Sequence, residues 1–344
     1  MNRTTEQRGG VIVALLLLIV MATAAGYWLW HDYQRFRSAP LQISGQGVNY
    51  QVKPGTSLME VANDLSEKGI LRQPFYLRAL ALDMGVSNKI KAGEYLIPAN
   101  TTPVMLLDQL VRGKVLEYSL TLIEGWTFKQ ALAALRNHPM IVQTLTSLST
   151  EQIMERLEHA GVYPEGRFFP DTYLFPRGTT DTDVLKRAYQ RMEKVLAQEW
   201  QARAEGLPLK TPYEALILAS IVERETGVAD ERTQVAGVFT RRLQKGMLLQ
   251  TDPTVIYGMG DSYDGNIRRT DLRADTPYNT YVHPGLTPTP IALPGRASIH
   301  AALHPADGDA LYFVATGQGG HYFSATLKEH NQAVQKYQIK RNKN

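Results

Sequence analysis

The chain has 344 residues and a formal net charge of +4, with no cysteine. This length allows two or three compact domains, and the absence of cysteine excludes disulfides, thiol nucleophiles and thiolate metal sites. The basic residues are scattered and are not interleaved with aromatic residues, which argues against nucleic-acid binding. Such a mild positive charge suits an anionic polymer or surface.

An uncharged segment extends from Gly9 to Trp30 and is long enough to cross a bilayer as one helix. Its tyrosine and tryptophans lie where interfacial aromatic residues belong. The small residues at 22–24 also resemble a signal-peptide cleavage site, but the apolar residues beyond them favour a retained span. Either form exports the rest of the chain. We expect a cytoplasmic N-terminus over 1–10, a transmembrane helix over 11–30 and a linker over 31–46.

Strand-turn-helix units follow the linker. Val48 to Val52 alternates as a half-buried strand, and Ser57 with Glu60 forms a capping box at the start of a helix. Two similar units come next, in which Thr102 and Thr127 are the expected helix caps. The pattern predicts one or two small α/β modules over 47–120.

The remainder, 121–344, carries longer helices and many turn residues. We expect a short helix ending at Gly161, a long helix over 183–204 and a proline-rich, aromatic, non-helical segment over 164–178. Short strand-like runs follow residue 246. The predicted fold class is therefore α+β, with one N-terminal transmembrane helix, the α/β modules and a mixed α+β domain.

Two glutamates follow a helix that is apolar on nearly every side. The segment ILASIVERETG places Glu223 and Glu225 at the end of this helix, which begins near Thr211. The helix dipole and burial both favour the protonated form of a carboxyl group there, and a general acid needs that form at neutral pH. At about 100° per residue the two side chains point roughly 200° apart, so only one faces a given cleft.

Local packing favours Glu223 as the acid. It follows Ala219 and Ser220, the least bulky side of the helix, whereas Glu225 follows a packing face. Glu231 is a poor candidate because we expect it in the first turn of the next helix, after the cap Asp230, where the dipole favours ionisation. Two solvated glutamates at a fraying helix end are the alternative.

Ordered motifs through the chain resemble a known family, the MltG (YceG-like) endolytic murein transglycosylases. The motifs are GTSLMEVANDL, AGEYLIP, PEGRFFPDTYLF, LASIVERETG, ERTQVAGVFTRRL, LQTDPTVIYGMG, PYNTY, LPGRASIHAALHP and YFVATGQGGHYFSATLKEH. The chain departs from the family pattern at Arg241, where members tend to have asparagine, and in the loop GLTPTPIALPG. These departures concern loop shape and substrate subsites.

The resemblance implies a single-pass protein of the bacterial inner membrane with a periplasmic catalytic domain over 121–344. It implies internal cleavage of the N-acetylmuramic acid to N-acetylglucosamine β-1,4 bond in nascent peptidoglycan, giving 1,6-anhydro ends and terminating strand elongation. Glu223 is the implied catalytic acid and base. The module over 47–120 looks like a LysM-type βααβ unit, and peptidoglycan synthases of cell elongation are the implied partners.

One carboxylate suffices in this reaction because the C6 hydroxyl of the muramyl residue is an intramolecular nucleophile. Aromatic and polar side chains in the motifs are the candidates for binding sugar. They are Asp171, Tyr173, Gln250, Asp252, Thr254, Tyr257, Tyr278, Asn279, Tyr281 and His321.

No cofactor is expected. His300 and His304 have helical spacing, but no HExxH glutamate lies between them, so we expect no metal site. Two other functions remain open: a membrane-anchored glycan-binding scaffold without activity, and a hydrolytic muramidase that leaves reducing ends.

Overall fold

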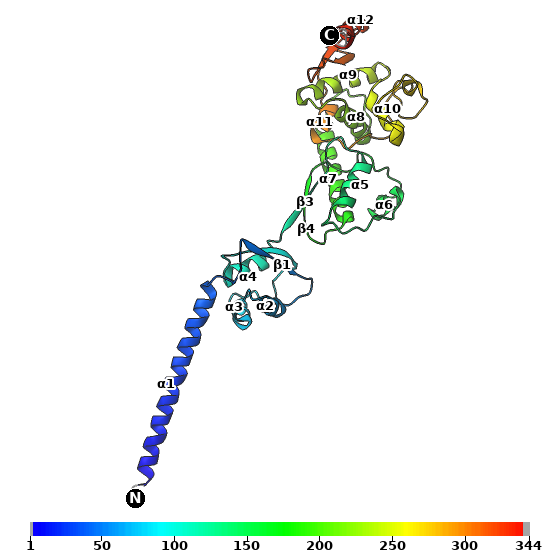
Figure 1. Ribbon diagram of the computed structural model, residues 1–344. Coiled ribbons are helices and arrows are strands. Elements are labelled where there is room, and N and C mark those ends of the chain that lie inside the picture. Colours follow the sequence, from blue (N-terminus) through cyan, green and yellow to red (C-terminus); the bar gives the residue numbers. More distant parts are fainter. Residues whose placement is uncertain (1–2, 340–344) are drawn as a thin grey trace. The chain divides into compact units, whose positions relative to one another are not determined.

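The computed structural model describes residues 3–339, and the chain divides into two compact units, Met1–Tyr118 and Ser119–Asn344 (Figure 1). The first unit combines helices with one two-stranded sheet, and the second combines helices with two short two-stranded sheets. The expected mixed α+β class is therefore confirmed. Residues 1–2 of the expected cytoplasmic N-terminus over 1–10 lie outside the described residues.

Helix α1 (Arg3–Ser38) opens the first unit and is drawn in blue in Figure 1. Its part from Ile12 to Ser38 is long and apolar enough to cross a membrane, with a mean hydropathy of 2.3. None of the most apolar stretch is buried inside the protein. A helix that is apolar all round and unburied by protein is consistent with a membrane span.

The expected linker over 31–46 is not a free tether. Helix α1 continues to Ser38, and the side chains of Phe36 and Leu41 are buried in the core of the first unit. The Leu41 N–H also donates to the Thr101 carbonyl at 2.8 Å. Sequence periodicity misses this packing because the partner residues come from distant parts of the chain.

The first unit pairs strand β1 (Gly47–Val52) antiparallel with β2 (Gly93–Pro98), with Tyr50 opposite Tyr95. Between the strands lie α2 (Leu58–Glu67) and α3 (Pro74–Asp83), and α4 (Pro103–Arg112) follows β2. The capping box of Ser57 and Glu60 and the cap at Thr102 form as predicted. Helix α3 was not predicted from the sequence.

The second unit contains two short sheets. Strand β3 (Glu117–Thr121), which begins at the boundary, pairs with β4 (Thr172–Pro176), and β5 (Tyr312–Ala315) pairs antiparallel with β6 (His321–Ser324). Strand β4 lies inside the proline-rich segment over 164–178.

Helices supply most of the second unit, and α8 lies at its centre. Residues Ala215 to Val222 of α8 are all buried, and α7, α9, α10 and α11 pack around it. The helices are α5 (Phe128–Asn137), α6 (Thr150–Arg156), α7 (Asp181–Gln201), α8 (Pro212–Glu225), α9 (Arg232–Gln244), α10 (Asp252–Met259), α11 (Arg296–Leu303) and α12 (Leu327–Val334).

One predicted cap in this unit is wrong. Residues Ala229–Glu231 form a short 3-10 turn, so Asp230 does not cap a helix, and Glu231 is the residue before α9 rather than in its first turn. The Glu231 carboxylate instead binds His321 of β6.

Candidate active site

The candidate site is built on the C-terminal end of α8. Its start is specified by Thr211, whose hydroxyl accepts the Glu214 N–H, and by Pro212 in the first turn. Ser220 is the one polar residue of the buried stretch, and its hydroxyl donates to the Ile217 carbonyl and accepts the Ile291 N–H. The helix is therefore held firmly in the core while its last turn carries two carboxyl groups.

Glu225 is half-buried and receives a hydrogen bond from the Thr251 hydroxyl, with 2.5 Å between Thr251 Oγ1 and Glu225 Oε2. Burial raises the pKa of Glu225 above its usual range, and the nearby charge of Asp252 adds to this rise. The Thr251 hydrogen bond and the charges of His321 and Arg242 act in the opposite direction. The net shift of the Glu225 pKa is upward, which is the direction that a general acid needs.

Polar side chains from three separate segments gather around Glu225. The Tyr281 hydroxyl donates to Asp252 Oδ1 at 2.5 Å, at the first residue of α10. His321 binds Glu231 twice, through its backbone N–H at 2.8 Å and through Nδ1 at 2.7 Å. Although burial opposes it, the His321 hydrogen bonds hold the pKa of Glu231 below its usual value. A fixed acceptor at Nδ1 orients the imidazole ring.

Glu223 faces a different part of the unit. Its Oε2 accepts the Gly295 N–H at 2.9 Å, and the carboxyl group of Glu124 lies against the same glycine. A Cβ atom at position 295 would lie 1.9 Å from Glu124 Oε1, so a larger residue there would displace the Glu124 side chain. Burial and the charge of Glu223 raise the pKa of Glu124, against the opposing charge of Arg232.

A further buried carboxyl group, Glu165, was missed in the sequence. It is 4% exposed, and burial raises its pKa to about 7 despite hydrogen bonds from the Phe128 N–H at 2.8 Å and the Tyr257 hydroxyl at 3.1 Å. The Tyr257 ring packs edge-on against Tyr278, with 4.9 Å between ring centroids. A glutamate within the aromatic run PEGRFFP is the signal that could have identified it.

The remaining predicted residues after residue 240 organise loops. Thr254 and Asn279 are fully buried, and their side chains bond to loop backbone at Thr251, Asp271 and Ala274. The exposed Gln250 has a positive φ of 51° and donates its N–H to the Thr280 carbonyl. Tyr278 donates to or accepts from the Thr289 hydroxyl at 2.9 Å. These contacts shape the loops that carry Asp252 and Tyr281.

Tyr173 lies in β4, and Asp171 is the residue just before this strand. Asp171 forms an ion pair with Arg191 at 2.5 Å, and its carbonyl accepts the Leu122 N–H. Tyr173 is buried, and its hydroxyl donates to the Phe169 carbonyl at 2.6 Å. The structure brings neither side chain to Glu225.

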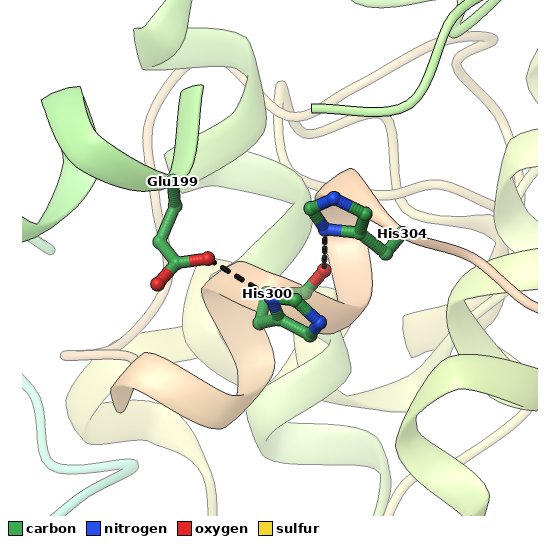
Figure 2. A group of neighbouring side chains, drawn as sticks. All are labelled: Glu199, His300 and His304. Atoms are coloured by element: carbon green, nitrogen blue, oxygen red, sulfur yellow. Dashed lines mark hydrogen bonds and ion pairs between the residues drawn. The ribbon is translucent and has the colours of Figure 1, made fainter. Parts of the chain in front are cut away.

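Among the described residues, one group could hold a metal ion (Figure 2). Ligand atoms of Glu199, His300 and His304 lie within 4.8 Å of one another. Both Glu199 oxygens are already engaged, by Arg296 Nε at 2.7 Å and by His300 Nδ1 at 2.9 Å, and His304 Nε2 lies 2.8 Å from the Ala202 carbonyl. These contacts form a polar network that joins α7 to α11.

Comparisons with known proteins point to one family. A model of the YceG-like family matches residues 50–336. An endolytic murein transglycosylase of Bacillus subtilis is 30% identical over 309 residues, covering 84% of this chain and 84% of that protein. One from Streptococcus pneumoniae is 26% identical, and the match covers 91% of this chain but only 62% of that longer protein.

A solved structure agrees with these relatives. The crystal structure of a YceG-like protein from Listeria monocytogenes superimposes with a TM-score of 0.52 at 26% identity. The superposition covers 83% of this chain and 98% of that one. The shared fold therefore includes nearly the whole of the neighbour.

Proposed function

We propose, from the premise that the chain belongs to the YceG-like family, that it is an endolytic murein transglycosylase. Its substrate is then the glycan strand of peptidoglycan, cut internally between N-acetylmuramic acid and N-acetylglucosamine. The products carry 1,6-anhydro ends, and cleavage of nascent strands terminates their elongation. The names of the relatives from Bacillus subtilis and Streptococcus pneumoniae support this activity.

The surroundings of Glu225 at the end of α8 support a specific acid. Its carboxyl group accepts the Thr251 hydroxyl and lies near the side chains of Asp252 and His321, and burial raises its pKa. We place the acid and base role on this residue. Glu225 first donates its proton to the glycosidic oxygen as the bond to C1 breaks. As a carboxylate, it then accepts the proton of the C6 hydroxyl, whose oxygen forms the new bond to C1. The atoms balance without water or a cofactor.

The sequence favours Glu223 for the same role, so Glu223 is the alternative proposed acid, and the contacts of the two residues differ. The Glu223 carboxyl group accepts the Gly295 N–H and lies beside the carboxyl group of Glu124. Glu225 has both a hydroxyl partner and the surrounding polar groups that a sugar ring requires. Substitution of each glutamate in turn distinguishes the assignment to Glu225 from the assignment to Glu223.

The polar residues around Glu225 are the proposed sugar-binding groups, chiefly Asp252, Tyr281 and His321. Each has an exposed or partly exposed side chain and a hydrogen-bond partner that fixes its direction. Sugar hydroxyls and acetamido groups are bound by such fixed donors and acceptors together with aromatic faces. Tyr257 and Tyr278 supply aromatic faces from the neighbouring cluster.

The first unit has a proposed binding role of its own. The order β1, α2, α3, β2 with antiparallel strands supports a LysM-like module for polymers containing N-acetylglucosamine. We further propose that α1 spans the bacterial inner membrane once, with the catalytic unit in the periplasm. Peptidoglycan synthases of cell elongation are the proposed partners at that surface.

Product mass tests the reaction. Uncrosslinked glycan strands are digested with the full chain in detergent, and the new ends are weighed. Ends lighter by one water than hydrolysis products are expected. Reducing ends of hydrolytic mass would instead identify a muramidase, and strands left intact by the wild-type protein would identify a glycan-binding scaffold.

A further inference from the structure

The end of α1 is packed against α3 within the first unit. The Tyr76 ring contacts Tyr33 and Phe36 edge to face, with 5.7 and 5.5 Å between ring centroids. At the start of α3, Gln73 Nε2 lies 3.4 Å from Asp32 Oδ2. The first turn of α3 is therefore held at the level of Asp32 on α1.

That level is close to the expected end of the membrane span. A helix rises 1.5 Å per residue, and about 20 residues cross the hydrocarbon core. A span over residues 11–30 therefore places Asp32 only about 3 Å outside the core. The polar interface on each side of the core is roughly 5–8 Å thick. Since Gln73 contacts Asp32, the first turn of α3 lies at interfacial depth.

The outward face of α3 suits this position. Phe75 is 68% exposed, Arg78 is exposed, and Leu82 follows at the helical spacing that puts it on the same face. The opposite face carries the buried Leu77 and Leu80. An exposed phenylalanine beside an arginine is the composition of helices that lie in the headgroup region, where the ring enters the acyl boundary and the guanidinium binds lipid phosphate.

We propose that α3 is a membrane-surface element, with Phe75 inserted into the leaflet that α1 leaves and Arg78 at its phosphates. The occupant of this face is lipid because α3 is fixed to the same helix that crosses the bilayer. The inference rests on the proposed span of α1. Its consequence is that two contacts with the membrane, rather than one flexible stem, hold the first unit at the bilayer surface.

The chain contains no cysteine, so single-cysteine variants of the full chain can be labelled at one position each. Phe75→Cys, Leu82→Cys and Met105→Cys are labelled with a polarity-sensitive dye and placed in vesicles of phosphatidylethanolamine and phosphatidylglycerol that carry nitroxide lipids. Met105 is the matched control because it is 55% exposed on α4, near Thr101, which bonds to Leu41 beyond the end of α1.

The expected result is a graded one. Quenching at position 75 should exceed that at position 105 several-fold. Quenching at position 82 should be intermediate. The neighbouring Asp83 contacts Arg37, which lies about 7 Å further along α1 than Asp32. Equal quenching at positions 75 and 105 would overturn the inference.

A fourth position separates this inference from the proposed span. Leu17→Cys lies within the apolar part of α1, and its label should be quenched most deeply. Strong quenching at 17 with none at 75 would overturn the surface role of α3 alone. No quenching at 17 would overturn the span and the inference with it, while the product masses from glycan digestion would be unaffected.

Discussion

At the residue scale, two glutamates on one helical turn have distinct surroundings. Glu225 is half-buried beside Thr251, whereas Glu223 accepts the Gly295 N–H. Helical spacing correctly predicted that the two would face different ways. It could not show which face carries the polar groups, because Thr251, Asp252 and His321 come from loops and a strand far along the chain.

Removal of the Thr251 hydroxyl should change the pH dependence of catalysis. The hydrogen bond stabilises the charged form of Glu225, so Thr251→Val should raise the pKa of Glu225 further. The basic limb of the kcat/KM profile reports the ionisation of the acid and should move to higher pH. Profiles of wild type, Thr251→Val and the exposed control Glu205→Gln provide the measurement. A basic limb that stays in place in Thr251→Val would count against Glu225 as the acid.

Glu165 predicts a pH-dependent stability. Its pKa is about 7 in the folded protein and near 4.5 when unfolded, so the folded state retains a proton that the unfolded state loses over this interval. The contribution of Glu165 to the free energy of unfolding is therefore fully present below pH 4.5. It falls by about 3 kcal/mol at most as the pH rises to 7. Glu165→Gln should lack this decline.

Urea unfolding at pH 4.5 and pH 7.5 measures the effect. The difference in unfolding free energy between the two pH values should be smaller in Glu165→Gln than in wild type. The exposed Glu155→Gln serves as control and should behave as wild type. An unchanged difference in Glu165→Gln would show that Glu165 ionises normally in the folded protein.

At the element scale, the starts of helices could be predicted from the sequence better than the pairing of one element with another. Caps at Ser57, Thr102 and Thr127 formed as predicted because each depends on residues three positions apart. Helix α3 has no side-chain cap hydrogen bond and was missed. The pairing of β3 with β4 joins segments about fifty residues apart, and local pattern carries no information on such contacts.

The stability of the second unit's core depends on the hydroxyl group of Ser220, which accepts the Ile291 N–H. Ser220→Ala should leave the Ile291 N–H buried without a partner and lower the unfolding free energy by about 1–3 kcal/mol. Ser262→Ala on the surface is the matched control and should cost much less. Denaturant unfolding of both variants gives the comparison. Equal stability of the two would mean that the Ile291 N–H finds another acceptor.

Arg241, where the family resemblance leads us to expect asparagine, joins two segments of the second unit. Its guanidinium donates to the carbonyls of Ala310 and Ala306 at 2.8 and 2.9 Å. Gly237 leaves room for it, because a Cβ atom there would lie 2.9 Å from Arg241 Nη1. The arginine therefore fastens the segment before β5 to α9.

At the scale of the whole molecule, α1 contributes to the first unit as well as to the proposed span. Phe36 and Tyr33 pack onto α3, so the segment expected to be a linker forms part of a core. The sequence could not reveal this, since a short amphipathic continuation of an apolar helix has no distinct pattern.

Truncation should separate the two roles of α1. A chain that begins at Ala39 loses Phe36 and should have a first unit less stable by about 3 kcal/mol than a chain that begins at His31. The second unit should be unchanged. Calorimetry of both chains resolves the two transitions, and coincident first-unit transitions would contradict the packing role of Phe36.

The catalytic assignment itself is tested most directly by comparing Glu225→Gln, Glu223→Gln and the surface control Glu205→Gln on purified glycan strands. Loss of the acid should lower kcat of Glu225→Gln by about 100-fold to 10,000-fold, with thermal stability preserved. Glu223→Gln keeps a side-chain oxygen that can accept the Gly295 N–H and should lower kcat by no more than about tenfold. Full activity in Glu225→Gln, with activity abolished in Glu223→Gln, would contradict the account and return the acid to Glu223.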